Sequence, residues 1–368
     1  MTKMTKFTCP FCIREYNVSK VKYVCPDCGE TSEPKFGEHE PIKCKHDGCG
    51  GLATQRKCPI CDQEIPKMAL ETSNLPFSIV GVSTSGKTNY ITVMLQELSK
   101  AAGLRLALGS QTRDTARHQR ENRDRIYEEH VPAAGTEAGY NFPQIWYIRN
   151  LLKKSGSNVP TYTFTIFDGA GEDHENLDTT STVCRYINAS KAIILTIDPL
   201  VLSKIRCGGI IDPEVMKNSL GGYKGVTKNA EDVINSVAVY IKAARGIKST
   251  KMLDIPVAVV LTKFDTLLQH KDFAPNALIK SPSLTIRDGK VDLTEIQQVH
   301  EEIQNWLYGI DEGSFVNALQ SHFKEFYFFG ISSFGEPPKA DQRLPDAIHP
   351  HRVLDPILWL FKKATFID

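Results

Sequence analysis

An α/β fold with a mostly parallel sheet, preceded by two small metal-binding modules, is the architecture that three features of this 368-residue sequence predict. First, an apolar run at 76–80 leads through a glycine-containing turn at 81–88 into apolar residues at helical spacing, which is typical of a strand followed by a helix. Second, apolar runs and helix-like segments alternate over the rest of the chain. Third, eight of the ten cysteines form four close pairs within the first 61 residues. We therefore place the main domain at 71–368.

The overall composition argues against several classes of protein. Lys and Arg number 44 against 43 Asp and Glu, so no global field favours nucleic acid or an acidic membrane. No apolar run approaches the roughly 18 residues that a membrane helix requires. Residues 1–6 lack the apolar core of a signal peptide. We therefore expect a cytoplasmic protein without a membrane span.

Each of the four cysteine pairs has the spacing of a metal-binding turn. Two thiolates on one tight turn, matched by two on another, suit a closed tetrahedral Zn²⁺ site. Disulfides and a redox C-x-x-C are the competing interpretations, but disulfides fit the cytosol poorly and a redox motif would not recur without its βαβ setting. His46 is an alternative ligand within the four-residue gap of the third pair. Pairing neighbours along the chain predicts two sets of zinc ligands, Cys9, Cys12, Cys25 and Cys28, then Cys44, Cys49, Cys58 and Cys61.

These two sets resemble zinc ribbons, which we place at 1–33 and 34–70. Residues 1–70 carry 11 Lys and Arg against 9 Asp and Glu. Two zinc centres with four thiolates apiece each add −2, so the metallated region comes out near −2. The absence of a basic excess favours a protein-docking role over nucleic-acid binding.

Residues 81–88 read GVSTSGKT and fit the phosphate-binding pattern G-x-x-x-x-G-K-[ST]. Glycines let the backbone wrap closely around a phosphate, so that N–H groups and the next helix N-terminus point at the negative charge. Lys87 is expected to reach the β- and γ-phosphates, and the Thr88 hydroxyl to hold Mg²⁺. A chance glycine turn is the alternative, which the flanking strand and helix disfavour. The nucleotide-binding residues predicted here are Gly81, Ser83, Thr84, Ser85, Gly86, Lys87, Thr88 and Asn89.

A highly charged helix is predicted within 111–130, where Arg113, Arg117 and Arg120 recur at helical spacing. A solvated helix face explains these arginines better than a catalytic role does. A loop rich in glycine and alanine follows at 132–139.

Two apolar runs at 144–149 and 161–167 predict an antiparallel hairpin. The second run ends in Asp168 and continues as Gly-Ala-Gly171, so a strand delivers the pattern D-x-x-G. In this pattern the Asp holds Mg²⁺ through water, and the Gly can turn its N–H toward the γ-phosphate. Asp198 also ends an apolar run, but it lacks this context and is interpreted as an ordinary strand-end residue.

A buried strand at 257–261 leads into Thr262-Lys263-Phe264-Asp265, which fits the guanine-selective element [NT]-K-x-D. A carboxylate at Asp265 can accept two hydrogen bonds, from the ring N–H and the exocyclic amine of guanine. Adenine offers an acceptor at the first place and no amine at the second, so it would leave the carboxylate unpaired. Lys263 is expected to lie along the base plane and brace the phosphate loop.

The remaining stretches complete the domain. An apolar run at 325–331 ends in Ser332 and Ser333, which suit a loop whose backbone touches the guanine carbonyl oxygen. An ordinary sheet edge explains this run almost as well. The stretches at 199–250 and 266–310 contain helix-like segments beyond a minimal domain, and we expect them to carry partner specificity.

With these elements in order, residues 76–365 resemble a P-loop GTPase of the translation-factor-related class, which includes the small and large signalling GTPases. GVSTSGKT, DGAG and TKFD at 81–88, 168–171 and 262–265 carry the resemblance. It implies the P-loop GTPase fold, in which a mostly parallel sheet with one antiparallel strand has helices on both faces. Zinc ribbons fused to such a domain are also similar to bacterial GTPases of the double-GTPase, conflict-system type.

The family resemblance also implies the ligands of Mg²⁺. A threonine in the loop before the hairpin closes over the ion in the GTP state, and Thr136 is the candidate, with Thr112 and Thr115 behind it. Thr88 and Asp168 complete the expected set. The implied catalytic residues are Lys87, Thr136, Gly171 and Glu172.

Two residues depart from the family pattern. Thr262 stands where Asn is usual, which removes an amide brace to the phosphate loop. Glu172 stands where many relatives place the glutamine that orients the attacking water. Because a carboxylate near the γ-phosphate is repelled by it, we expect slow hydrolysis that a partner stimulates.

We therefore expect a cytoplasmic regulatory GTPase that uses Mg²⁺ and two structural Zn²⁺ ions. Protein partners would dock on the zinc ribbons or the insertions, and a nucleotide-dependent dimer is one source of stimulation. A GTP-binding scaffold that hardly hydrolyses is the alternative from a different class. A zinc-ribbon nucleic-acid binder with a structural nucleotide is the third candidate.

Overall fold

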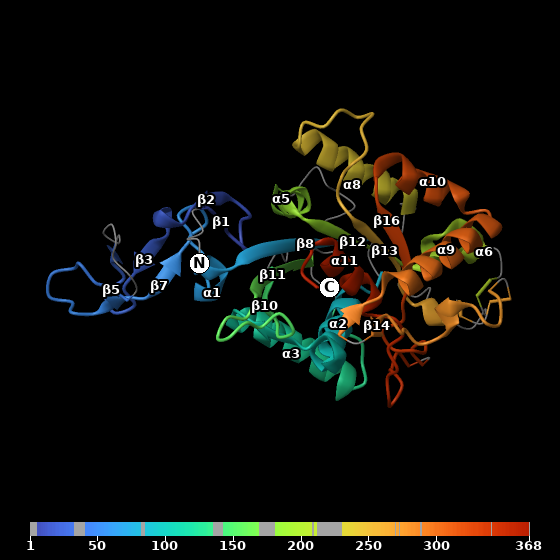
Figure 1. Ribbon diagram of the computed structural model, residues 1–368, viewed down its shortest axis with the longest axis horizontal. Coiled ribbons are helices and arrows are strands. Elements are labelled where there is room, and N and C mark those ends of the chain that lie inside the picture. The colour runs from blue at the N-terminus through green and yellow to red at the C-terminus, as the bar shows by residue number, and fades with distance from the viewer. Residues whose placement is uncertain are drawn as a thin grey trace.

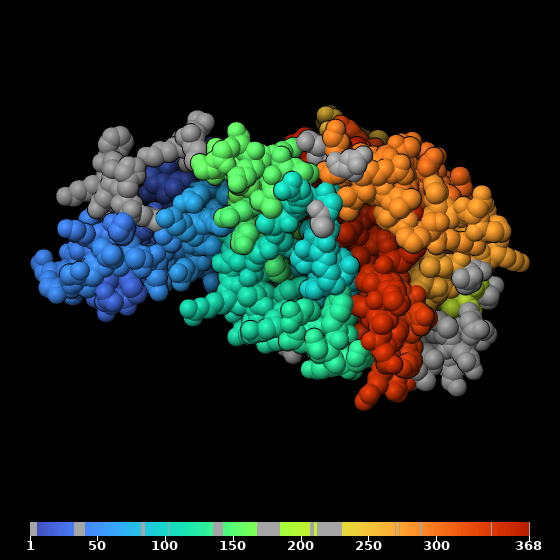
Figure 2. Space-filling view, turned by 60° about the horizontal axis from the view of Figure 1, so that its bottom comes forward, coloured from blue at the N-terminus to red at the C-terminus, as the bar shows by residue number. Residues whose placement is uncertain are grey.

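The computed structural model describes residues 6–32, 41–81, 85–134, 143–168, 181–207, 210–211, 230–268, 270–271, 273–287, 289–339 and 341–367. The chain forms a small N-terminal module and a larger α/β body, and α1 (Lys67–Glu71) lies between them (Figure 1). The module, blue, projects from one end of the body in the space-filling view (Figure 2). Among the described helices, none has the length and apolar character needed to cross a membrane.

Seven strands form the central sheet, in the order β16-β13-β12-β8-β11-β10-β9. Strand β10 is antiparallel to both of its neighbours, and the other pairs are parallel. This confirms the predicted fold class and the predicted hairpin, which is β10–β11. The strands are β8 (Ser73–Gly81), β9 (Leu106–Ser110), β10 (Gln144–Asn150), β11 (Thr161–Asp168), β12 (Ala192–Ile197), β13 (Val257–Leu261) and β16 (Phe326–Gly330).

Helices cover both faces of this sheet, as predicted (Figure 1). Successive residues of β12 point to opposite faces, so that Ile193 and Leu195 join one apolar core whereas Ala192 and Ile194 join the other. The first core takes buried residues from α5, α8 and α10 and most of those from α9. The second core takes them from α2, α3 and α11. The helices are α2 (Lys87–Lys100), α3 (Arg113–Tyr127), α5 (Ser181–Ala189), α8 (Ala230–Ala244), α9 (Leu293–Gly309), α10 (Gly313–His322) and α11 (Asp355–Lys363).

Polar side chains fix where two of these helices begin. Thr112 Oγ1 accepts the Thr115 N–H at 3.1 Å and caps α3, the predicted charged helix. Asp292 caps α9 by accepting the Thr294 N–H at 2.8 Å. The shorter elements of the body are η2 (Ala102–Leu104), η3 (Pro199–Val201), α6 (Ser203–Cys207), η4 (Phe264–Thr266), η5 (Leu278–Lys280), β14 (Ile286–Arg287) and β15 (Lys290–Val291).

The N-terminal module is built from short antiparallel strands. Strands β1 and β2 form a hairpin, and β5 pairs with β6. Strand β3 pairs with both β4 and β7, so that Lys22 lies opposite Lys57. The two predicted ribbons at 1–33 and 34–70 are therefore interleaved rather than consecutive. The elements are β1 (Lys6–Thr8), β2 (Glu15–Asn17), η1 (Val18–Lys20), β3 (Lys22–Val24), β4 (Thr31–Ser32), β5 (Ile42–Lys43), β6 (Leu52–Ala53) and β7 (Gln55–Lys57).

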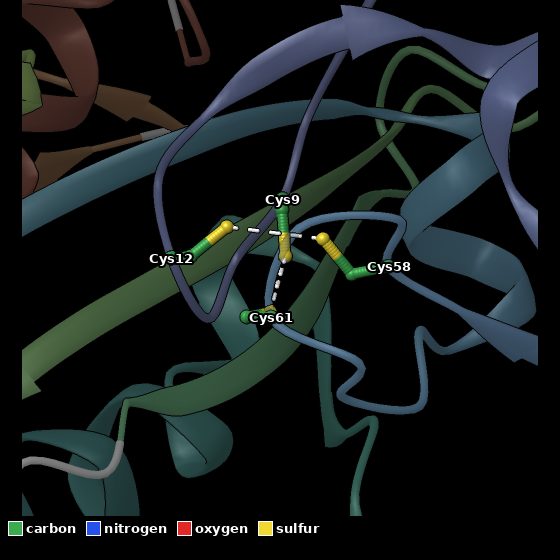
Figure 3. Close-up of side chains that lie close together, drawn as sticks. All are labelled: Cys9, Cys12, Cys58 and Cys61. Carbon is green, nitrogen blue, oxygen red and sulfur yellow. Dashed lines mark hydrogen bonds between the residues drawn. The ribbon is translucent and has the colours of Figure 1, made fainter.

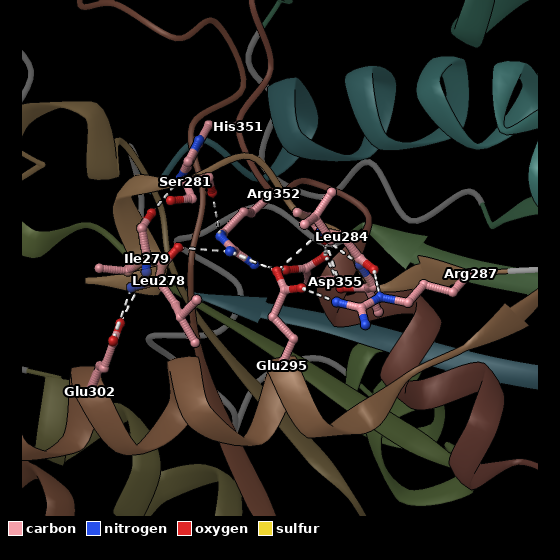
Figure 4. A network of polar contacts seen from close by, with 12 residues as sticks. Leu278, Ile279, Ser281, Leu284, Arg287, Glu295, Glu302, His351, Arg352 and Asp355 are labelled. Carbon is pink, nitrogen blue, oxygen red and sulfur yellow. Dashed lines mark hydrogen bonds and ion pairs between the residues drawn. The ribbon is translucent and has the colours of Figure 1, made fainter. Parts of the chain in front are cut away.

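A buried arginine ties the C-terminal segment to the insertion before α9 (Figure 4). Arg352 donates to Glu295 Oε1 and to Asp355 Oδ2, both at 2.8 Å. Its remaining N–H groups reach the carbonyl oxygens of Leu278 at 2.7 Å and Ser281 at 3.0 Å. In Figure 2 the C-terminal segment, red, lies between the teal segment of α2 and α3 and the orange segment before α9. One guanidinium thus stabilises the negative charge of two buried carboxylates and joins three parts of the chain by hydrogen bonds.

Arg352→Ala should lower the free energy of unfolding by about 3–5 kcal/mol, because it leaves Glu295 and Asp355 buried without their cation. Arg287→Ala is the matched control, since the largely exposed Arg287 lies 3.9 Å from Asp292 and from Glu295. We expect it to change stability by no more than about 1 kcal/mol. Denaturant unfolding followed by circular dichroism measures both values. Equal losses in the two variants would contradict a special role for Arg352.

Candidate functional site

The turn between β8 and α2 has the backbone that a phosphate loop requires. Gly86 has φ +76°, a left-handed backbone conformation that residues other than glycine rarely adopt. Gly81 is required for a different reason, because a Cβ there would collide with the hydroxyl and carbonyl oxygens of Thr196 on β12. Ser83 and Thr84 lie outside the described residues and remain predictions. The described ends of the loop therefore fit the predicted motif.

Side chains at the start of α2 are already held in place. Lys87 is buried, and its Nζ donates to the Gly81 carbonyl oxygen at 3.1 Å, so its ammonium lies over the loop. Ser85 Oγ lies 3.0 Å from Thr196 Oγ1. Thr88 is buried in the first turn of α2, and Asn89 Oδ1 accepts the Ala133 N–H at 2.8 Å. Asn89 thus contacts the segment that leads toward Thr136.

The predicted Mg²⁺ ligands are only partly described. Asp168 ends β11, where it pairs with Ile79 of β8, so its backbone lies at the same sheet edge as the phosphate loop. The Asp168 side chain lies outside the described part of the chain, as do residues Thr136, Gly171 and Glu172. These assignments remain predictions.

Thr112 and Thr115, the alternatives to Thr136, have structural roles. Thr112 Oγ1 donates to Thr115 Oγ1 at 2.8 Å in the cap of α3. The buried Thr115 hydroxyl in turn accepts the Ile145 N–H at 3.0 Å. Both hydroxyls therefore hold α3 against β10, which leaves Thr136 as the family-implied candidate.

Thr262 contacts the phosphate loop directly. Its hydroxyl donates to the Ser85 carbonyl oxygen at 2.9 Å, and its N–H donates to the Ile197 carbonyl oxygen, also at 2.9 Å. Thr262 lacks the side-chain amide that is usual at this position, but its hydroxyl supplies a brace to the loop. A hydroxyl is long enough here because β8, β12 and β13 are adjacent parallel strands whose ends meet at one edge.

Lys263 has a partner that the sequence does not reveal. Its Nζ donates to Asp198 Oδ2 at 2.5 Å, and Asp198 is buried at the end of β12. Asp198 Oδ1 also accepts the Leu200 N–H at 2.9 Å, which fixes the carboxylate. Asp198 is thus a positioning residue of the site, not an ordinary strand end. The parallel pairing of Ile197 with Leu261 brings Asp198, one residue further along β12, near Lys263, two residues beyond Leu261.

Asp265 lies beside Ser332, the first residue after β16 and Ile331 that the sequence singled out. Burial raises the pKa of Asp265, although a hydrogen bond from the Ser332 hydroxyl opposes the rise. Ser332 Oγ also accepts the Gly335 N–H at 2.8 Å, which fixes its rotamer. Ser333, which follows, is partly exposed. Strand β16 is also the edge of the sheet, which agrees with the alternative interpretation of this run as an ordinary sheet edge, and the proposed contact with guanine remains a prediction.

Eight cysteines form two groups in the N-terminal module. We call Cys9, Cys12, Cys58 and Cys61 the proximal tetrad, whose side chains converge from two turns (Figure 3). We call Cys25, Cys28, Cys44 and Cys49 the distal tetrad. Within each tetrad the ligand atoms all lie within 4.8 Å of one another. The predicted sets were wrong, because the first pair joins the fourth and the second joins the third. His46 is exposed and is not part of either tetrad.

The geometry of both tetrads fits Zn²⁺. Sulfur–sulfur separations are 3.9 and 3.8 Å in the proximal tetrad and 3.7 and 3.5 Å in the distal one. A tetrahedron with Zn–S bonds of ~2.3 Å requires about 3.8 Å. A disulfide requires ~2.05 Å and is therefore excluded. The N–H groups of Phe11, His46 and Ile60 lie 3.4 Å from ligand sulfurs, where they would stabilise thiolates.

Comparison with known proteins gives one curated relative. The chain is 24% identical over 332 residues to a protein of Mycolicibacterium smegmatis named putative ESX-1 scaffolding and assembly protein SaeC. The match covers 82% of this chain and 78% of that protein. No family model matches the sequence.

Solved structures include two nucleotide-bound proteins that share little sequence with this chain. The Methanosarcina barkeri Roco2 RocCORdC structure, bound to GDP, has a TM-score of 0.31 and 13% identity over 79% of this chain. The GTPase-like domain of Saccharomyces cerevisiae Ski7, bound to GTP, has a TM-score of 0.33 and 12% identity over 80%. This chain spans 49% and 50% of those two chains.

Paired substitutions distinguish the observed tetrads from consecutive ones. The unmodified chain should contain two zinc atoms by elemental analysis, because each tetrad supplies four thiolates. Cys9→Ser with Cys61→Ser removes ligands from one tetrad and should leave one zinc. Cys9→Ser with Cys28→Ser removes a ligand from each and should leave none. The opposite result for the two double variants would restore the consecutive pairing.

Proposed function

We propose that this chain binds GTP with Mg²⁺ and hydrolyses it to GDP, and that its N-terminal module holds two structural Zn²⁺ ions. The observation that carries the proposal is the hydrogen bond from the Thr262 hydroxyl to the Ser85 carbonyl oxygen, at 2.9 Å. It joins the loop proposed to hold the phosphates to the loop proposed to select the base. A chance match to either motif would not produce this contact.

The preference for guanine follows from the surroundings of Asp265. Burial raises the pKa of this carboxyl, which means that the protein alone stabilises its charge poorly. The ring N–H and amine of guanine would supply two donors to the charged form. The salt bridge between Lys263 and Asp198 holds the neighbouring ammonium at 2.5 Å from a fixed carboxylate. Its aliphatic stem is then available to the base plane.

The phosphates would be held by the start of α2. Lys87 would exchange its bond to the Gly81 carbonyl for phosphate oxygens, and the helix N-terminus adds its N–H groups. Thr88, Asp168 and Thr136 are the proposed Mg²⁺ ligands, and the proposal is supported by the pairing of Asp168 with Ile79 on β8, the strand that leads to α2 and Thr88. A bound Mg²⁺ neutralises phosphate charge.

Hydrolysis requires that a water be oriented toward the γ-phosphate. The Gly171 N–H is the proposed γ-phosphate contact, and Glu172 occupies the position of the water-orienting glutamine. Because its charge repels the γ-phosphate, we propose slow turnover of the isolated chain and stimulation by a protein partner or a second copy.

A GTP-binding scaffold with little hydrolysis is the second candidate. The relative named as a scaffolding and assembly protein favours it, as does the carboxylate at position 172. In this case the zinc module would serve as the docking surface for a protein partner. Closed sites with four thiolates leave no open position for zinc chemistry, which agrees with a structural role.

Guanine nucleotides should bind at least ~100-fold more tightly than adenine nucleotides, because only guanine satisfies the buried carboxylate. Asp265→Asn should shift the preference toward xanthine nucleotides, since an amide can donate to the xanthine oxygen. Asp254→Asn is the matched control, because Asp254 pairs with Lys324 on the surface. Calorimetry with GTP, ATP and XTP measures each affinity. Equal affinity for GTP and ATP would overturn the proposal, as would unchanged GTP binding in Lys87→Ala.

The isolated chain should hydrolyse GTP at about 10⁻⁴–10⁻² s⁻¹, the range of GTPases that act without a partner. Glu172→Gln should raise this rate, because it removes the charge that repels the γ-phosphate. Single-turnover phosphate release at several protein concentrations measures both rates and any effect of dimerisation. A fast rate that does not depend on concentration, and that Glu172→Gln leaves unchanged or lowers, would show that the chain already carries a complete catalytic set.

A further inference from the structure

A hydroxyl group of the α/β body contacts the turn that carries two ligands of the proximal tetrad. The Tyr186 hydroxyl on α5 lies 2.6 Å from the carbonyl oxygen of Pro10 and 2.7 Å from that of Phe11. Both carbonyls belong to the turn between Cys9 and Cys12, so a single O–H donates to the turn that carries half of the zinc ligands. Tyr186 is only 1% exposed, so water does not replace these hydrogen bonds.

The ring of Tyr186 packs against β11, the strand that ends in Asp168. The ring stacks on Phe167 with centroids 4.1 Å apart and an interplanar angle of 9°. Phe167 directly precedes Asp168, the proposed Mg²⁺ residue, on β11. Ile13, which follows Cys12, is buried in the same apolar core as Phe167 and Tyr186. A continuous set of packed groups therefore leads from the end of β11 to the zinc turn.

The C-terminal end of α5 is fixed to the body. The Asn188 carbonyl oxygen accepts from Arg245, which directly follows α8, and Ser190 Oγ lies 2.7 Å from Ser78 Oγ on β8. This end of the helix cannot slide along the sheet without breaking these bonds. The contacts that connect the end of β11 with the zinc turn thus run through the Tyr186 ring and hydroxyl.

The distal tetrad provides an internal comparison. Its described apolar neighbours, Tyr23, Ile42 and Ala53, all belong to the N-terminal module. Among the described residues, the proximal tetrad thus contacts the α/β body, whereas the distal tetrad has apolar neighbours only within its own module.

We propose that Tyr186 couples the proximal zinc site to the bound nucleotide, so that GDP and GTP give this site different affinities for Zn²⁺. The inference rests on the proposed function, since it requires that a guanine nucleotide binds beside Asp168. Linkage makes the effect reciprocal, so zinc in the proximal tetrad also changes the relative affinity for GTP and GDP. The distal zinc site is independent of nucleotide. The N-terminal module is then a reporter of the nucleotide state rather than a passive appendage.

The test measures zinc affinity by competition with a chromogenic chelator of known affinity. The full chain is saturated with Mg²⁺ and either GDP or a non-hydrolysable GTP analogue. We expect two zinc-release steps, of which only one shifts between the nucleotides, by about fivefold or more. Cys28→Ser removes a distal ligand, and the remaining step should keep the shift. Cys9→Ser provides the complementary assignment, since its remaining step should not shift.

Tyr186→Phe isolates the hydroxyl, because it keeps the ring that stacks on Phe167. It should reduce the shift to less than about twofold and leave both zinc atoms bound. Tyr90→Phe is the matched control, since the Tyr90 hydroxyl is buried and makes no hydrogen bond within the described residues. It should retain the full shift.

Three results would overturn the inference. Zinc affinities that are equal in GDP and the GTP analogue would show that the sites are not coupled. A full shift in Tyr186→Phe would show that the hydroxyl does not carry the coupling. Failure of calorimetry to detect any guanine nucleotide binding would remove the proposed function as well, whereas nucleotide binding with unshifted zinc affinities would remove this inference alone.

Discussion

The close approach of β8 to β12 is the contact on which the candidate site depends. Gly81 lies against Thr196 with no space for a side chain, and the Thr196 hydroxyl lies 3.0 Å from Ser85 Oγ. Thr262, which directly follows the neighbouring strand β13, donates to the Ser85 carbonyl oxygen. The phosphate loop is thus held by the ends of two neighbouring strands before any ligand binds, and preorganisation of this kind lowers the entropy lost on binding.

The fold could be predicted from the sequence where local patterns decide it. The periodicity of apolar and charged residues predicts the buried strands and the charged helix. The alternation of strands with helix-like segments predicts a mostly parallel sheet. Strand β9 was missed because its five residues, LALGS, contain no β-branched side chain and pair only with β10 at the edge. The interleaving of the N-terminal strands was missed because it depends on β3 pairing with β7 rather than on either segment alone.

The candidate site could likewise be predicted from the sequence only in part. Motifs identify residue types that contact a ligand, but they do not identify partners from other strands, such as Asp198 for Lys263. The hydrogen bond from the Thr262 hydroxyl to the phosphate loop depends on the distance between two strand ends, and the motif carries no information about that distance. Cysteine spacing indicated zinc ligands, yet four equivalent pairs can combine in three ways. The contact of Tyr186 with the turn at Pro10 joins segments 176 residues apart and leaves no local signal.

The nested arrangement of the two tetrads has a consequence for biosynthesis. The distal ligands Cys25 and Cys49 are 24 residues apart, whereas the proximal ligands Cys9 and Cys61 are 52 residues apart. The ribosome therefore releases all four distal thiols while the proximal tetrad still lacks its second half. The inner loop can close on its metal first, and this closure shortens the chain that must loop back to complete the outer site. Metal-dependent assembly of the module can thus begin at the distal tetrad and end at the proximal tetrad.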